Sequence, residues 1–136
     1  MRLFRRRKPA PIGSLRLGEH SDDIADYNVF TVSESRFPES FAQLWAGASQ
    51  EEQEAKQIRR WATLIPVTDP SSQLIADLAA EIDGHRVAYL RPPHLTYLAR
   101  KITQESVETV EVPAFIEWGP AGQTVMLVIN IDSPVN

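Results

Sequence analysis

The stretch from Ala80 to Ile102, AEIDGHRVAYLRPPHLTYLARKI, predicts more about the fold than any other part of the chain. Asp83-Gly84 separates two strand-like runs, and such a pair favours a two-residue hairpin turn because both central residues need a positive φ. Pro92 and Pro93 then introduce a helix, since proline is well tolerated in the first helical turn. The stretch therefore predicts a strand, a tight turn, a second strand and a helix.

The segments around this stretch predict further strands and a second helix. Pro38 and Gly47 bound a helix in which Phe41, Leu44 and Trp45 recur at helical spacing. Strand-like runs cover residues 26–32, 58–67, 107–118 and 124–131. Two segments stay open: 48–56 between a helical turn and a loop, and 73–82 between a helix at its start and a strand at its end. The sum predicts an α+β fold, a small antiparallel β-barrel of about five or six strands with two packed helices.

Length and composition fit one globular domain. The chain has 136 residues, of which 43% are hydrophobic and 24% charged. It contains no cysteine, which excludes disulfides, thiolate nucleophiles and cysteine metal sites. No apolar run approaches the roughly 18 residues that a membrane-spanning helix needs, and no hydrophobic core of a signal peptide follows Lys8. We therefore expect a cytoplasmic protein without membrane insertion.

Charge is distributed unevenly along the chain. Six of the 14 basic residues precede Glu19, the first acidic residue: Arg2, Arg5, Arg6, Arg7, Lys8 and Arg16. The remainder carries eight basic against 18 acidic side chains, a net charge of −10. We expect residues 1–25 to form a flexible basic tail and residues 26–136 to form the domain. A solvated arm explains the tail most simply; the alternative is contact with nucleic acid or an anionic membrane surface.

Catalytic and metal-binding patterns are absent from the sequence. His20, His85 and His94 lie far apart and do not combine with carboxylates at metal-ligand spacing. There is no glycine-rich phosphate loop and no Gly-x-Ser-x-Gly nucleophile turn. Adjacent carboxylates such as Asp22-Asp23 lie in polar segments, where solvation explains them. We therefore expect no enzyme activity, no metal and no cofactor.

Arginine beside aromatic residues indicates binding chemistry. Arg59-Arg60-Trp61 places two cations beside an indole on a predicted strand, and Arg36-Phe37 repeats the combination. Such pairs can hold a phosphate and stack a base. The simpler interpretation is that Trp61 faces the core while an arginine covers the surface.

Three segments, taken in order, resemble the HIRAN-like domains: SESRFPESFAQLWAG (33–47), IRRWATLIPV (58–67) and AAEIDGHRVAYLRPPHLTYLARKI (79–102). Such domains are small β-barrels with packed helices, which stand alone in bacteria and are attached to DNA-remodelling enzymes in eukaryotes. The better-known ones capture the 3′ end of single-stranded DNA. The resemblance implies that Arg36 and Phe37 contact nucleic acid, and it places His85 or Arg86 near the same face.

The resemblance has one serious gap. Residues 71–78 carry Gln73 and Leu74 where the family has an aromatic and an acid in its DNA-end pocket, and Ala88 replaces a glycine. Two functions therefore remain: a non-catalytic module that binds single-stranded DNA or DNA ends, or a protein-interaction domain that has lost this pocket. The second would use an apolar patch of Phe41, Trp45 and Trp118. The predicted nucleic-acid-binding residues are Arg36, Phe37, Arg59, Arg60, Trp61, His85 and Arg86.

Overall fold

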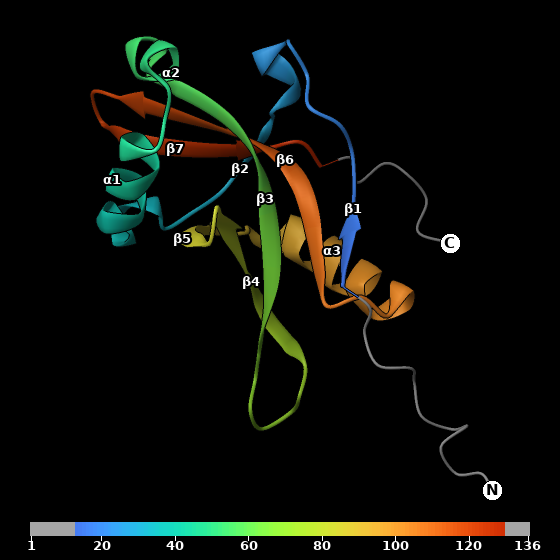
Figure 1. Cartoon of the computed structure of the whole chain (residues 1–136). Coiled ribbons are helices and arrows are strands. Elements are labelled where there is room, and N and C mark those ends of the chain that lie inside the picture. The colour runs from blue at the N-terminus through green and yellow to red at the C-terminus, as the bar shows by residue number, and fades with distance from the viewer. Residues whose placement is uncertain (1–12, 130–136) are drawn as a thin grey trace, which may run out of the picture.

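A computed structural model describes residues 13–129 and is built around a strongly curled sheet (Figure 1). The strands are β1 (Ser14–Arg16), β2 (Val29–Phe30), β3 (Gln57–Thr68), β4 (Ile75–Ile82), β5 (His85–Tyr89), β6 (Thr109–Gly119) and β7 (Gly122–Leu127). They follow the order β2-β7-β6-β3-β4-β5, and β1 lies parallel to β6. All other pairings are antiparallel. The predicted α+β class with a small curled antiparallel sheet is confirmed.

One short segment joins the two ends of this strand order. Val29 and Phe30 pair with β7, and Val32 exchanges two backbone hydrogen bonds of 2.9 Å with Tyr89 of β5. The predicted strand over 26–32 is therefore regular over two residues only, because the segment passes from β7 to β5. We call the bridged pair Val32–Tyr89 the seam.

The turn at Asp83-Gly84 has the predicted form. Asp83 has φ of 50° and Gly84 of 82°, and the flanking residues Ile82 and His85 pair in register. Both central residues thus occupy the left-handed region that a type I′ hairpin requires. The second predicted hairpin is also present, with Gly119 opposite Gly122.

The ambiguous segment 73–82 is a strand over most of its length. The helix expected at its start is wrong: residues 69–74 form an exposed loop, and β4 begins at Ile75. β4 pairs with β3 along its length and with β5 over residues 79–82, which satisfies much of its backbone. Gln73 and Leu74 therefore lie in the loop of the long β3–β4 hairpin, which projects from the body in Figure 1.

Within the described part of the chain, three α-helices lie against the sheet. α1 (Pro38–Ala46) and α3 (Pro92–Glu105) were both predicted, each with proline at its start. α2 (Gln50–Ala55) resolves the open segment 48–56, and a capping box between Ser49 and Glu52 begins it. No helix within residues 13–129 is both long and apolar enough to span a bilayer.

The curled sheet carries apolar cores on both of its faces. The larger lies inside the curl and includes Leu64, Leu78 and Val110, with Phe41 and Leu98 contributed by α1 and α3. The smaller lies on the outer face and consists of Tyr27, Phe115 and Met126, with Val128 packed against them. Because the outer face of the sheet also carries an apolar core, a further segment of the chain must cover that face.

That cover is the N-terminal part of the described chain, which corrects the predicted extent of the tail. Residues 13–25 were expected to be flexible, but β1 pairs with β6 and a 3₁₀ helix (η2, Ile24–Asp26) follows. Leu15 and Leu17 pack on the main core, whereas Tyr27 belongs to the outer core and His20 packs against Trp61 on the same face. Residues 1–12, with five of the six basic residues of the predicted tail, lie outside the described residues.

Candidate nucleic-acid interface

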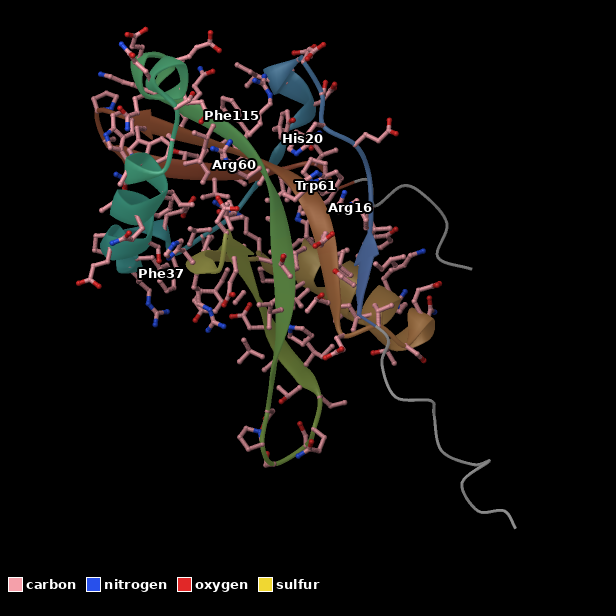
Figure 2. The ribbon with its side chains drawn as sticks, viewed as in Figure 1. Arg16, His20, Phe37, Arg60, Trp61 and Phe115 are labelled. Carbon is pink, nitrogen blue, oxygen red and sulfur yellow. The ribbon has the colours of Figure 1, made fainter. Side chains whose placement is uncertain are left out.

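The seven predicted contact residues occupy separate parts of the fold. Arg36 and Phe37 lie at the seam, Arg59 and Trp61 lie on the outer face, and Arg60 and Arg86 make ion pairs. Figure 2 shows Phe37 well separated from Trp61, His20 and Arg16. The chain therefore does not gather the seven residues in one groove.

At the seam, one arginine lies over two aromatic rings. The Arg36 guanidinium carbon is 5.5 Å from the ring centre of Tyr89 and 5.9 Å from that of Phe37. The two rings are 5.8 Å apart and tilted by 49°. A 3₁₀ helix (η3, Glu34–Arg36) positions the arginine immediately before α1. We call Arg36, Phe37 and Tyr89 the seam cluster.

The guanidinium of the seam cluster is exposed and makes no ion pair with any residue between 13 and 129. Glu34, two residues earlier, uses one carboxylate oxygen to accept hydrogen bonds from the Thr31 hydroxyl at 3.1 Å and the Val125 amide at 3.3 Å. This carboxylate is therefore oriented toward the backbone of β7. The Arg36 donors are available to an external acceptor.

The seam cluster has an apolar and a basic neighbour. Phe30 is 50% exposed and lies two residues before Val32, while the exposed Arg91 lies two residues after Tyr89. Because Val32 and Tyr89 pair in antiparallel fashion, Phe30 and Arg91 extend from the same end of the seam. The surface here combines exposed aromatic area with two cations.

On the outer face, a second arginine–aromatic group holds the N-terminal segment against the sheet. We call it the clasp; its members are Arg16, His20, Tyr27, Arg59, Trp61 and Phe115. Arg59 donates hydrogen bonds to the backbone carbonyls of Ser21 at 3.2 Å and Asp22 at 3.4 Å. Its guanidinium also lies 5.7 Å from the Tyr27 ring and 5.3 Å from the Phe115 ring.

Trp61 belongs to the clasp rather than to the core or to a free surface. The Arg16 guanidinium lies 4.0 Å from the indole centre, and the His20 ring packs edge-on at 5.0 Å. Burial lowers the pKa of His20, and the positive charges of Arg59 and Arg16 lower it further. The interpretation that Trp61 simply faces the core is therefore wrong, because the N-terminal segment supplies its neighbours.

The remaining cations of the predicted set have acidic partners. Arg60 pairs with Glu52 through two contacts of 2.7 and 3.0 Å and lies 3.7 Å from Asp83. Hydrogen bonding from Arg60 is the main reason that the pKa of Glu52 falls to about 2. Arg86 pairs with Glu81 at 3.2 Å. His85 is partly exposed beside the turn and makes no hydrogen bond through its ring to another described residue.

Tyr89 is the member of the seam cluster that the sequence did not identify. It lies 52 positions beyond Phe37 and reaches it only because Val32 bridges to β5. The Val-Ala-Tyr-Leu pattern of the return strand was visible in the sequence, but the bridge from its Tyr89 to Val32 was not. The aromatic residue on the strand after the Asp83-Gly84 turn is the sequence feature that could have indicated this contact.

Two tryptophans line a separate open depression of about 700 Å³ between α1 and the β6–β7 hairpin. Trp45 and Trp118 pack edge-to-face at 5.2 Å, and Pro38 and Pro120 complete the apolar lining with Lys56 at the edge. Phe41 was predicted to join this patch, but it is 1% exposed and packs in the main core. Its ring nevertheless lies edge-to-face with that of Trp118 at 6.4 Å, so it supports the depression from the core side.

Residues 13–129 contain no group of three histidine or acidic side chains that could hold a metal ion. Comparison of the chain with protein-family models, with curated proteins and with solved structures gives no match. The resemblance to HIRAN-like domains therefore stays a prediction.

Proposed function

We propose that this protein is a non-catalytic binding module that binds single-stranded nucleic acid at the seam cluster. The observation that supports this most directly is the exposed Arg36 guanidinium over the Tyr89 and Phe37 rings without a carboxylate partner among residues 13–129. An arginine held in this way offers its edge to a phosphate. The HIRAN-like resemblance points to the same Arg36-Phe37 pair.

The proposed contact has two components. Arg36 attracts backbone phosphates independently of sequence, and the exposed Arg91, two residues after Tyr89, adds a second cation. The exposed ring of Phe30 and the partly exposed ring of Tyr89 offer faces on which a base can stack, an interaction that contributes about 1–3 kcal/mol per base. A single strand supplies phosphate and an accessible base face together, whereas a duplex hides its base faces.

The charge of the rest of the chain limits the expected affinity. Residues after Arg16 carry a net charge of −10, which opposes an extended phosphate contact. We therefore expect a short footprint and a salt dependence of about one to two phosphates, a slope of log K against log salt near −1. The basic residues up to Lys8 would add a separate, sequence-independent contribution.

The test measures binding of a fluorescent oligothymidine to the full chain at several salt concentrations. Arg36→Gln is expected to weaken binding about fivefold and to reduce the salt slope by about 0.7, the contribution of one phosphate on a single strand. Tyr89→Leu is expected to weaken binding about tenfold with little change in slope, because it removes stacking and not charge.

Two control variants separate the seam from general electrostatics. Arg100→Gln makes the same charge change at an exposed position of α3 and should leave the affinity within twofold. Removal of residues 1–12 should weaken binding while preserving the effects of the seam variants. If the shortened chain does not bind, or if Arg100→Gln and Arg36→Gln have equal effects, the seam site is wrong.

A second candidate function rests on the tryptophan depression. Its lining of Trp45, Trp118, Pro38 and Pro120 is the kind of surface that receives an extended apolar or proline-rich segment of a partner protein. Aromatic residues are enriched in the energetically important parts of protein interfaces. This is the structural counterpart of the interaction domain that the sequence left open.

Tryptophan fluorescence tests this second function with a proline-rich peptide as the probe. A shift in emission on titration, lost in Trp45→Ala and retained in Trp61→Phe, would support it. A Trp118→Phe variant keeps most of the apolar lining and serves as the conservative comparison. Unchanged emission at millimolar peptide in the wild-type chain would exclude this class of partner.

A further inference from the structure

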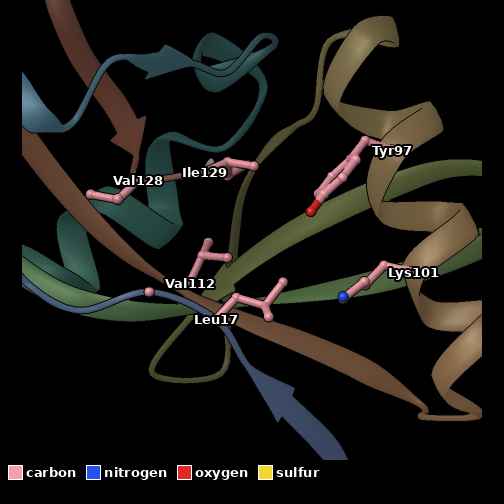
Figure 3. A pocket seen from close by; sticks show the side chains of 7 residues that line it. Leu17, Tyr97, Lys101, Val112, Val128 and Ile129 are labelled. Atoms are coloured by element: carbon pink, nitrogen blue, oxygen red, sulfur yellow. The ribbon is translucent and has the colours of Figure 1, made fainter. Parts of the chain in front are cut away.

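A second, more enclosed cavity lies between α3 and the sheet, away from the seam cluster and the tryptophan depression. It has a volume of about 300 Å³ and is lined by Leu17, Gly18, Tyr97, Lys101, Val112, Val128 and Ile129. β6, the segment after β1 and the segment after β7 form one wall, and α3 forms the other (Figure 3). Most of this lining is aliphatic.

Two polar groups enter this aliphatic space from the helix. Tyr97 and Lys101 are one turn apart on α3, so their side chains share a face. Figure 3 shows the phenol oxygen and the ammonium nitrogen directed from α3 toward the apolar side chains. Within residues 13–129 the Tyr97 hydroxyl has no hydrogen-bond partner and Lys101 has no ion pair. Both groups therefore have hydrogen-bond donors that no described residue accepts.

We propose that this cavity binds a small monocarboxylate with an apolar chain. The carboxylate would accept a hydrogen bond from the Tyr97 hydroxyl and pair with the Lys101 ammonium, while the chain would contact Leu17, Val112 and Ile129. Small-ligand sites commonly combine a mostly apolar lining with a few placed polar groups. At about 30 Å³ for each water-sized group, the cavity accommodates on the order of ten non-hydrogen atoms, the size of octanoate.

The site is independent of the proposed nucleic-acid function. Tyr97 and Lys101 do not belong to the seam cluster, and the ligand class differs in both shape and charge. A carboxylate is favoured over a cation or a neutral chain because both polar lining groups donate hydrogen bonds. A divalent phosphate would place two charges against a single ammonium in an apolar cavity, which is costly.

The experiment titrates octanoate into the full-length, isotope-labelled chain and follows backbone amide shifts by NMR. We expect shifts at Leu17, Val112 and Ile129 and a Kd below about 1 mM. Lys101→Gln should weaken binding at least tenfold, and Tyr97→Phe about threefold, since only one hydrogen bond is lost. Arg100→Gln, the adjacent charge change outside the cavity, should leave the affinity unchanged.

One further ligand and one shortened chain complete the test. Octanol should bind at least tenfold more weakly than octanoate; equal binding would overturn the carboxylate assignment. Amide shifts confined to the surface of α3 would likewise overturn the proposal that octanoate binds in the cavity. If octanoate bound only to a chain ending at Ile129, residues 130–136 would be the occupant and the ligand proposal would be wrong. Because oligothymidine binding is measured separately, failure here leaves the seam proposal standing.

Discussion

The clasp and the seam cluster both combine arginine with aromatic rings, but their arginines differ in what they bind. In the clasp, Arg59 donates to two backbone carbonyls and Arg16 pairs with Glu111 at 3.0 Å. In the seam cluster, the Arg36 guanidinium lies over two rings, makes no ion pair with another described residue and stays exposed. The clasp thus fixes the N-terminal segment, whereas the seam cluster retains donors for a ligand.

The aromatic residues of the two groups differ in their exposure to solvent. Tyr27 and Phe115 of the clasp are 1% and 0% exposed, whereas Phe37 and Tyr89 of the seam cluster are partly exposed and their neighbour Phe30 is 50% exposed. An arginine beside a buried ring covers a core, and an arginine beside an exposed ring forms a surface that a partner can reach. Adjacency of arginine and aromatic residues in a sequence does not distinguish these cases.

The largest effect should come from removing the buried ring of the clasp. Phe115→Ala is expected to lower the free energy of unfolding by about 3–5 kcal/mol, because it leaves a cavity beneath Tyr27 and Arg59. Denaturant unfolding followed by circular dichroism measures the change.

Phe30→Ala is the matched control at the seam, where the same side chain is half exposed. We expect a change within about 0.5 kcal/mol. Equal losses from the two variants would mean that Phe30 also covers a core, and the comparison between clasp and seam would fail.

The ion pair of Arg60 with Glu52 provides the second test. Arg60 lies between Arg59 and Trp61 in sequence, yet it belongs to neither the clasp nor the seam cluster. Its partner Glu52 has a pKa of about 2 in the fold, against an ordinary glutamate pKa of 4.5. A depressed carboxyl pKa contributes stability above the unfolded pKa, and this contribution is lost as pH falls from 4.5 to about 2. With solvent screening of a partly exposed pair, we expect a loss of about 1–2 kcal/mol.

Glu52→Gln should show this loss already at neutral pH, and its difference from wild type should shrink on acidification through that interval. Glu51→Gln, an exposed neighbour on α2, makes the same change without an arginine partner among the described residues. Unfolding curves for the three chains across the interval provide the measurement. A constant difference at every pH would show that Glu52 stabilises by packing or capping rather than by charge.

The sequence predicted the elements that depend on neighbouring residues. The turn at Asp83-Gly84 needs two positive φ values, which Asp-Gly tolerates, and the proline-initiated helices follow from the missing amide hydrogen and fixed φ. The segment 73–82 was only half predicted, because its apolar residues suit a helical face and a doubly paired strand equally well.

The candidate site was harder to predict because it depends on contacts between distant residues. Arg36 and Phe37 were identified, but Tyr89 joins them through a single bridge to Val32. Conversely, Arg59 and Trp61 look like binding residues in the sequence until residues 16–27 fold over them. Whether an arginine is free is decided by the segment that packs on it, which local sequence does not contain.

A smaller effect should follow from the clasp hydroxyl. The Tyr27 oxygen accepts a hydrogen bond from the Ser21 amide at 3.0 Å and lies 2.9 Å from His20 Nδ1. Tyr27→Phe keeps the ring but leaves these groups unpaired, so we expect a loss of about 1 kcal/mol. Denaturant unfolding gives this value, and amide exchange at residues 20–26 should accelerate. Tyr89→Phe, whose hydroxyl makes no hydrogen bond within the described part of the chain, should have no comparable effect.

The smallest predicted difference compares one arginine from each cluster. Arg16→Gln removes an ion pair with Glu111 and a stacking contact 4.0 Å from Trp61, each worth at most about 1 kcal/mol at an exposed position, so we expect a loss near 0.5–1 kcal/mol. Arg36→Gln removes only longer ring contacts, and we expect a loss below about 0.5 kcal/mol. High salt should narrow the gap because it screens the Arg16 ion pair and leaves the ring contacts largely intact. A seam arginine that stabilises the fold as much as Arg16 would have a structural role, and a phosphate would then compete with that role for its donors.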